Sequence, residues 1–416
     1  MKVIVLGAGV IGVSTAYELA CDGHDVTVVD RQDAVAQETS FANGGQLSFN
    51  HGPLAQPGTV RKAIKWLGKK DAPLLYRLRM DPQLWSWTLK FMACCSEPQY
   101  FNNIEHMLRL SLYARERLHQ TLEREEIAFS HMRTGIMTLY GDDRDFGLAR
   151  EHAVALRELG SERQIMDRAG CLETEPALQH SASPIVGATL SASDESGDCR
   201  AFTEALAESC KKRGAQFQLG TDITGLKRED WQIKCVQTDQ GDIEGDVYVM
   251  ALGSYSPLFL HSLGLNVPIY PAKGYSVTVP VKDDEGAPKM SLTSYDHKLV
   301  FSRLGNKLRI AGMLEFGGYD TELDEERARV VLNNVMKLFP RGLETGHAEF
   351  WTGLRPQTPD SIPVVGRGAQ ENLVINTGHG MLGWTMALGT ARIAADLAGH
   401  KAPEIDINAL GWERFA

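Results

Sequence analysis

The sequence of 416 residues lacks the features that mark membrane-spanning, metal-binding and nucleic-acid-binding proteins. No apolar run approaches the roughly 20 residues that a membrane-spanning helix needs, and the first run, Val3-Ile4-Val5-Leu6, stops at a glycine instead of extending into a secretory signal. The seven cysteines include no Cys-x-x-Cys pair and no cluster with histidine at zinc-ligand spacing. With a net charge of −10, the surface has no general attraction to nucleic acid. These absences predict a cytoplasmic protein with reduced thiols, no metal site and no nucleic-acid partner.

The strongest positive signal lies within the first 30 residues. The short apolar run at residues 3–6 is followed by the turn Gly7-Ala8-Gly9-Val10-Ile11-Gly12 and by an apolar helix pattern. A second strand, residues 26–29, ends at Asp30. This order of strand, glycine-rich turn, helix, strand and acid is typical of a βαβ unit that binds a dinucleotide.

Each glycine of the turn has a physical task in such a unit. Gly7 makes the tight turn out of the strand, Gly9 lets the backbone approach a pyrophosphate, and Gly12 lets the helix lie close to the sheet. The phosphates lie at the helix N-terminus, where free N–H groups favour negative charge. Asp30 follows Gly12 by 18 residues and is placed to bind a ribose diol, which argues against a 2′-phosphate and so against NADP.

The next segment favours FAD over NAD. Residues 38–48, Glu-Thr-Ser-Phe-Ala-Asn-Gly-Gly-Gln-Leu-Ser, are small, polar and rich in glycine. An NAD domain would more often continue with another helix and strand, whereas a loop of this kind suits a ligand that runs deep into the protein. The alternative is a plain surface loop.

The rest of the chain predicts a second structural unit inserted into the first. Residues 60–160 read as mostly helical, residues 267–279, 298–303 and 307–313 alternate like strands of an antiparallel sheet, and residues 381–398 form a closing helix. We therefore expect an α/β fold with a discontinuous, Rossmann-like FAD-binding domain and an α+β substrate domain with an antiparallel sheet. The expected boundaries are 1–50, 195–262 and 352–416 for the FAD-binding domain, and 51–194 and 263–351 for the substrate domain.

Besides the N-terminal unit and Glu38–Asn43, several short motifs stand out: residues 63–67 (AIKWL), 71–74 (DAPL), 194–200 (DESGDCR), 274–278 (GYSVT), 353–360 (GLRPQTPD) and 376–385 (NTGHGMLGWT). These motifs resemble the bacterial FAD-dependent D-amino acid dehydrogenase family. The last two also resemble the wider group of FAD amine oxidoreductases that includes glycine oxidase and sarcosine oxidase. Together the motifs span nearly the whole chain.

The resemblance implies that FAD oxidises a D-amino acid to the imino or 2-oxo acid, with hydride passing from Cα to flavin N5 and electrons to a quinone or other acceptor. It implies non-covalent FAD, because Gly353 stands near the position where some sarcosine oxidase relatives carry the attaching cysteine. From the glycine pattern and the resemblance together, the predicted cofactor-binding residues are Gly7, Ala8, Gly9, Val10, Ile11, Gly12, Asp30, Arg31, Thr39, Ser40, Asn43, Gly44, Gln46, Leu47, Ser48, Gly253, Gly380, Met381, Leu382 and Gly383.

Two segments depart from the family pattern, and three other functions stay open. Residues 45–51 and Met381 differ from the D-alanine-directed enzymes, so the substrate need not be D-alanine. One alternative is an oxidase or dehydrogenase of glycine, sarcosine or a cyclic secondary amino acid such as D-proline or D-hydroxyproline. The others are an FAD-binding subunit of a hetero-oligomeric amine dehydrogenase and an NAD dehydrogenase.

Four side chains are candidates for the chemistry. Arg355 is the best carboxylate anchor, because a guanidinium makes two parallel bonds to a carboxylate; the alternative is a structural ion pair with Asp360 or Glu349. Arg303 is a second candidate anchor. His51 is the third candidate, either as a base or as a hydrogen-bonding wall of the pocket. Tyr275 is the fourth, and it either closes the pocket or lies in the core.

The helix that opens at Gly380-Met381-Leu382-Gly383 is predicted to stabilise negative charge on the reduced flavin.

A basic and aromatic segment is a candidate membrane contact. Lys62, Lys65, Lys69 and Lys70 surround Trp66-Leu67, and Leu84-Trp85-Ser86-Trp87 follows. Segments of this composition can lie at a membrane interface, which here would be the cytoplasmic face of the inner membrane. The alternative is an ordinary amphipathic helix packed on the core.

Overall fold

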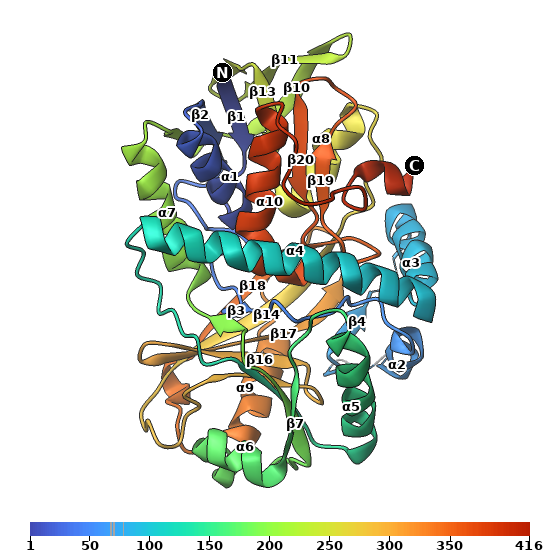
Figure 1. The fold of residues 1–416 in the computed structure, drawn as a ribbon, viewed down its shortest axis with the longest axis vertical. Helices are drawn as coiled ribbons and strands as arrows, with labels where there is room; N and C mark the ends of the chain where they lie inside the picture. The colour runs from blue at the N-terminus through green and yellow to red at the C-terminus, as the bar shows by residue number, and fades with distance from the viewer. Residues whose placement is uncertain (67–68, 70, 78) are drawn as a thin grey trace.

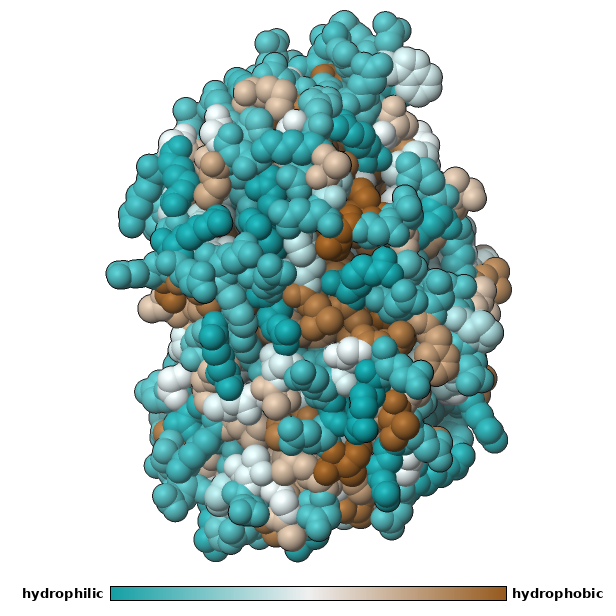
Figure 2. Space-filling view, viewed as in Figure 1, coloured by the Kyte–Doolittle hydropathy of each residue, from teal (hydrophilic) through white to brown (hydrophobic). Residues whose placement is uncertain are grey.

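Two sheets carry the fold, one in each half of the molecule as drawn in Figure 1. The computed structural model describes residues 1–66, 69, 71–77 and 79–416, so the predictions on Leu67 and Lys70 lie outside the described residues. Helix α4 (Glu97–Arg124) runs across the molecule between the two halves (Figure 1). On the face drawn in Figure 2, which is mostly hydrophilic, apolar side chains gather in a band just below the level of this helix.

The upper sheet is the predicted dinucleotide-binding sheet. Its strands in spatial order are β19 (Val364–Arg367), β20 (Leu373–Thr377), β13 (Val247–Met250), β1 (Lys2–Leu6), β2 (Asp25–Val29) and β9 (Gln216–Gln218). All neighbours are parallel except β19 and β20. Residues 3–6 are buried on both faces, which explains why this strand is a continuous apolar run.

Helices and a small meander cover the two faces of this sheet. Val3 and Val5 pack in one core with the helices α1 (Val10–Cys21), α7 (Cys199–Lys212) and α10 (Gly383–Ala398). Ile4 and Leu6 pack in another core with α8 (Ser256–Ser262) and with a meander. The meander strands are β10 (Ile223–Glu229), β11 (Gln232–Thr238) and β12 (Gly241–Glu244). The alternation along β1 thus assigns one side of the strand to each core.

The lower sheet is largely antiparallel and lies below the first. In spatial order its strands are β18 (Glu349–Gln357), β14 (Tyr270–Pro280), β17 (Lys307–Phe316), β16 (Leu299–Leu304), β15 (Ser291–Ser294), β5 (Ile136–Tyr140), β7 (Gly187–Ser191) and β6 (Gln164–Asp167), with β4 (Leu74–Tyr76) beside β17. Helix α9 (Glu325–Leu338) packs on one face. The other face meets the loops that leave the upper sheet.

The region at residues 60–160 differs from the expected run of helices. It contains α2 (Thr59–Trp66), α3 (Pro82–Cys94), α4 and α5 (Asp143–Arg157), but also the strands β4 and β5. Strand β5 pairs in parallel with β15 and antiparallel with β7, both distant in sequence. Its β conformation is therefore set by partners that a local pattern does not reveal.

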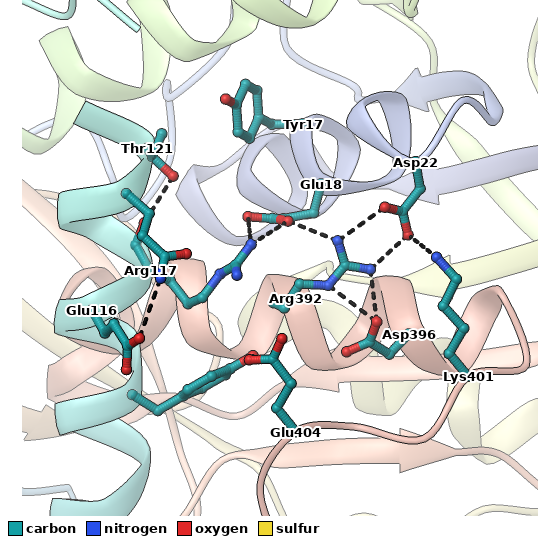
Figure 3. A network of polar contacts seen from close by, with 12 residues as sticks. Tyr17, Glu18, Asp22, Glu116, Arg117, Thr121, Arg392, Asp396, Lys401 and Glu404 are labelled. Atoms are coloured by element: carbon teal, nitrogen blue, oxygen red, sulfur yellow. Dashed lines mark hydrogen bonds and ion pairs between the residues drawn. The ribbon is translucent and has the colours of Figure 1, made fainter. Parts of the chain in front are cut away.

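A buried ionic network joins the first and last helices of the chain (Figure 3). Arg392 of α10 contacts Glu18 of α1 at 2.9 Å, Asp22 at 2.7 Å and Asp396 at 2.8 Å. Arg117 of α4 contacts the same Glu18 at 3.1 Å. Burial alone would raise the pKa of Asp22, but hydrogen bonds from Arg392 and a nearby lysine lower it. The network fixes α10 and α4 against the helix that begins at the glycine-rich turn.

Candidate flavin and substrate site

The glycine-rich turn leaves open space where a pyrophosphate would lie. A Cβ on Gly7, whose φ is +108°, would lie 2.6 Å from the Ala251 carbonyl oxygen, and a Cβ on Gly12 would lie 1.8 Å from the Gly7 carbonyl oxygen. By contrast, the nearest atom to a Cβ on Gly9 is Ser40 Oγ at 3.4 Å. Gly9 caps helix α1 without a side-chain bond, and the first turn has no acidic residue. This helix start suits an anion.

Asp30 closes the turn from the end of β2. Its carboxylate accepts hydrogen bonds from the backbone N–H groups of Ala8 at 2.6 Å and Gln32 at 2.8 Å. Burial raises the pKa of this carboxyl group, and the two N–H groups oppose the rise. Arg31, the next residue, pairs with Glu38 at 2.5 Å and so links β2 to the loop at residues 38–48.

That loop is held between the two sheets. Thr39 Oγ1 donates to the Leu354 carbonyl at 2.6 Å, Ser40 Oγ accepts from the Val10 N–H at 3.0 Å, and Asn43 Oδ1 accepts from the Gly45 N–H at 2.9 Å. These hydroxyl and amide groups hold the loop against the first turn and β18. Their predicted contact with a cofactor is not shown by these bonds.

Glycines let the same loop lie against the lower sheet. A Cβ on Gly44 would lie 2.7 Å from Val300 Cγ2, and one on Gly45 would lie 2.7 Å from Ser302 Cβ. Gln46 follows and donates to Ser291 Oγ at 3.1 Å. Val300, Ser302 and Ser291 therefore mark the face of the lower sheet that is turned toward the site.

The strand after the loop ties the site to the last helix. Strand β3 (Gln46–Leu47) pairs with β8 (Glu195–Ser196), and the Ser48 N–H donates to Thr385 Oγ1 of α10 at 3.1 Å. Leu47 is fully buried in the core of the upper half. The predicted residues of this segment are thus brought beside the N-terminus of α10.

The turn before α10 packs closely against β18 at a second helix start. Gly378 and Gly380 have φ values of +75° and +55°, and a Cβ on Gly380 would lie 2.6 Å from Gln357 Oε1. This buried oxygen accepts no hydrogen bond from the described residues. Leu382 is buried, Met381 is 37% exposed, and α10 begins at Gly383 with no acidic residue in its first turn.

Arg355 crosses the lower sheet toward β17. The side chain starts on β18 and lies over β14, because Gly274 has no Cβ; a Cβ there would lie 1.9 Å from Arg355 Nη1. Nη1 donates to the Met313 carbonyl at 2.9 Å. The guanidinium is half-buried, and the surrounding protein lowers its pKa to about 10.

No carboxylate of the described residues pairs with this guanidinium. Asp360, one of the two candidate partners, pairs with Arg414 at 2.8 Å, and Glu349 pairs with Lys307 at 3.3 Å. The structural ion pairs considered for Arg355 are therefore both made elsewhere. A desolvated cation without an anion is costly, and a bound carboxylate relieves that cost.

Two other candidates point away from the site. Tyr275 is fully buried among the residues under α9 and donates to Glu315 at 2.8 Å, and burial raises the pKa of its hydroxyl. Arg303 follows Ser302 on β16, so its side chain lies on the opposite face, and it pairs with Asp284 at 2.5 Å. The structure does not bring either residue together with Arg355, and neither enters the proposal below.

His51 follows the loop at residues 38–48. The residue is exposed to solvent, yet surrounding protein atoms and the charges of Arg163 and Lys298 lower the pKa of the imidazole to about 4. Neither Arg163 nor Lys298 was among the site residues predicted from the sequence. Arg163 carries no motif, and Lys298 is one residue of a turn, so only the folded chain reveals them.

A family model described as FAD dependent oxidoreductase matches residues 2–397. The chain belongs to this family. Among relatives, a D-amino acid dehydrogenase of Rhizobium rhizogenes is 45% identical, with 100% of each chain covered. One of Dechloromonas aromatica is 44% identical, with 97% of this chain and 98% of the relative covered.

Solved structures that share this fold include an L-proline dehydrogenase and a glycine oxidase. An L-proline dehydrogenase from P. horikoshii has a TM-score of 0.77 and 21% identity, covering 100% of this chain and 97% of that chain. A glycine oxidase from Bacillus cereus has a TM-score of 0.74 and 21% identity, covering 97% and 96%. These likenesses confirm the predicted Rossmann-like α/β fold, but the fold alone does not set the configuration of the substrate.

The residues present fit the FAD of this family. The open space at Gly9, the carboxylate of Asp30 and the unbonded Gln357 Oε1 beside Gly380 lie along the edge where β1, β2 and β20 end. Two helix starts without acidic residues, those of α1 and α10, meet this edge. The FAD-dependent prediction is confirmed, and the NAD alternative is excluded by the family.

Proposed function

We propose that the protein oxidises a D-amino acid to its imino acid, which water then converts to the 2-oxo acid. The observation that carries this proposal is the half-buried guanidinium of Arg355, which has no carboxylate partner among the described residues. The relatives that are 40–45% identical over their whole length bear the name D-amino acid dehydrogenase, which supports the D configuration. The test is reduction of the bound flavin by one enantiomer and not by the other.

The side chains of the site bind and orient the substrate. When bound, FAD supplies the acceptor of the hydride that leaves Cα. Arg355 holds the carboxylate by two parallel bonds and so fixes which face of Cα is presented.

His51 is neutral at pH 7, because its pKa is about 4. A neutral imidazole accepts or donates a hydrogen bond, but one with so low a pKa is a weak base. His51 therefore serves as a hydrogen-bonding wall, and the amine proton leaves to water. The start of α10 favours negative charge in its neighbourhood.

We further infer that an exposed apolar surface on α2 and α3 binds a membrane and so reaches a quinone acceptor. Trp85, Leu89 and Met92 lie at positions i, i+4 and i+7 of α3 and are 45%, 64% and 40% exposed. Ile64 of α2 is 63% exposed, and Met80, which precedes α3, is 89% exposed. Both helices lie at one edge of the molecule (Figure 1).

Basic residues surround this apolar surface. Arg61, Lys65, Lys69 and Arg79 are exposed, and such residues attract anionic headgroups. Trp87, in contrast, is buried and donates to the Gln357 carbonyl at 2.8 Å, so it belongs to the core. Within the described part of the chain, no helix is both long and apolar enough to cross a bilayer.

The triple substitution Trp85→Ser, Leu89→Ser and Met92→Ser is expected to weaken binding to anionic vesicles by about tenfold or more, because each buried apolar side chain contributes about 1.5–3 kcal/mol. Co-sedimentation measures the binding. Turnover with a soluble dye should stay unchanged, while turnover with a vesicle-bound quinone analogue falls. The matched control is Val154→Ser, an exposed apolar side chain of α5.

The wild type should reduce the quinone analogue faster than it consumes oxygen. If it stays in the supernatant with vesicles and does not reduce the analogue, the membrane proposal is wrong. Faster oxygen consumption would instead make the protein an oxidase.

A further inference from the structure

Lys298 lies next to the point that Arg355 reaches on β17. Leu299, the residue after Lys298, pairs with Gly312, and a Cβ on Gly312 would lie 2.6 Å from the Lys298 carbonyl oxygen. The next residue, Met313, provides the carbonyl that accepts the hydrogen bond from Arg355. The backbone of Lys298 and the guanidinium of Arg355 thus meet neighbouring residues of one strand.

The amino group of Lys298 lies over an aromatic ring and forms no ion pair with a carboxylate of the described residues. Nζ lies 3.2 Å from the ring centroid of Tyr295. Lys62 donates to the hydroxyl of the same tyrosine at 3.0 Å and pairs with Asp145 at 3.2 Å. Burial and the charge of Lys62 lower the pKa of Lys298 to about 8. Its backbone is in the left-handed region, with a φ of +53°, which is uncommon for a lysine.

Arg163 adds a second cation on the other side of His51. Its guanidinium donates to the carbonyl of Asn50, the residue before His51. The buried carboxylate of this region, Asp194, is engaged by two N–H groups of Asn50, at 3.1 Å and 2.9 Å. Burial raises the pKa of Asp194 to about 6, and the hydrogen bonds from Asn50 and the charge of Arg163 oppose this rise. No described carboxylate forms an ion pair with Arg163 or Lys298.

We propose that Lys298, with Arg163 and His51, forms a subsite for a carboxylate on the side chain of the substrate, so that the preferred substrate is an acidic D-amino acid. This inference rests on the function proposed above, in which Arg355 binds the α-carboxylate. One negative charge then meets Arg355 and the other meets the cations beside His51.

The preference follows from the cost of uncompensated charge. An apolar substrate side chain would leave the partly buried Lys298 without a carboxylate partner, and a basic one would add a further positive charge. A dicarboxylate instead supplies an anion to each cationic group. The departure of residues 45–51 from the D-alanine-directed pattern lies in this same region, because His51 is part of it.

The test compares D-glutamate and D-aspartate with their uncharged isosteres D-glutamine and D-asparagine, and with D-alanine and D-lysine. For the wild type we expect a kcat/KM for one acidic substrate that exceeds its isostere by about tenfold or more, and the lowest value for D-lysine. Lys298→Met should remove this preference and change the D-glutamine value by less than about threefold. Lys298→Arg, which keeps the charge, should retain it. Glutarate should inhibit the wild type more strongly than butyrate does, and Lys298→Met should lose that difference.

The outcomes separate the subsite from the proposed function. If D-alanine or D-lysine is oxidised as well as the acidic substrates and Lys298→Met affects every substrate alike, the subsite is overturned while D-amino acid oxidation stands. If no D-amino acid reduces the flavin, the proposed function and the subsite both fail.

Discussion

Arg355→Ala is expected to lower kcat/KM for a D-amino acid by about 100-fold or more while the purified protein keeps its FAD. The guanidinium lies over Gly274 and, among the described residues, makes one hydrogen bond, to the Met313 carbonyl, so little of the fold depends on it. The α-carboxylate of the substrate would lose its two charge-assisted bonds. Steady-state kinetics with a dye acceptor measure the loss, and the visible flavin spectrum measures cofactor content.

Arg355→Lys should recover little of this activity, since a point charge does not reproduce the planar fork of a guanidinium. Arg303→Ala is the matched control, because that guanidinium pairs with Asp284 on the opposite face of the sheet. It should leave kcat/KM within about threefold of the wild type. Near-normal turnover of Arg355→Ala with full FAD would show that this arginine does not bind the substrate.

Gly9→Val is expected to yield folded protein that purifies without FAD. The protein itself has room for a side chain at Gly9, where the nearest atom to a Cβ is Ser40 Oγ at 3.4 Å. The added methyl groups would occupy the approach to the start of α1, where we expect the pyrophosphate to bind. Far-UV circular dichroism should stay close to that of the wild type, while the flavin absorbance disappears.

Gly12→Val serves as the contrasting variant, because a Cβ there would lie 1.8 Å from the Gly7 carbonyl oxygen. It should fail to fold, whereas Gly9→Val should only fail to bind. Gly147→Val, in α5 with no neighbour within 4 Å of a Cβ, should keep its flavin. A full flavin content in Gly9→Val would remove the glycine-rich turn from the cofactor site.

The N-terminal unit was predictable because its signals are local. The buried run at residues 3–6, the turn to Gly12 and the acid at Asp30 each act within one strand, turn or helix. The structure shows β1, α1 and β2 where the pattern placed them. The predicted strands of the lower sheet were found with shifted ends, since β14 begins at Tyr270 and not at residue 267.

The side chains of the substrate site were harder to predict, because strand pairing decides which face each one occupies. Tyr275 and Arg303 carry suitable chemistry, but the alternation along β14 and β16 turns them toward α9 and the outer edge. Lys298 and Arg163 became candidates only because the fold brings their charges near His51. The division at residues 50, 194, 262 and 351 stays a prediction, as does the role of each cofactor-contacting side chain.

Anaerobic mixing of the FAD-loaded protein with D- and L-glutamate tests the central claim most directly. The account predicts that the D enantiomer bleaches the flavin absorbance within the time of a turnover, and that the L enantiomer and the decarboxylated amine, 4-aminobutyrate, do not. D-alanine serves as a second D substrate, so that failure of the acidic preference is told apart from failure of the reaction. Equal bleaching by both enantiomers, or by the amine without the α-carboxylate, would contradict a D-amino acid dehydrogenase anchored by Arg355.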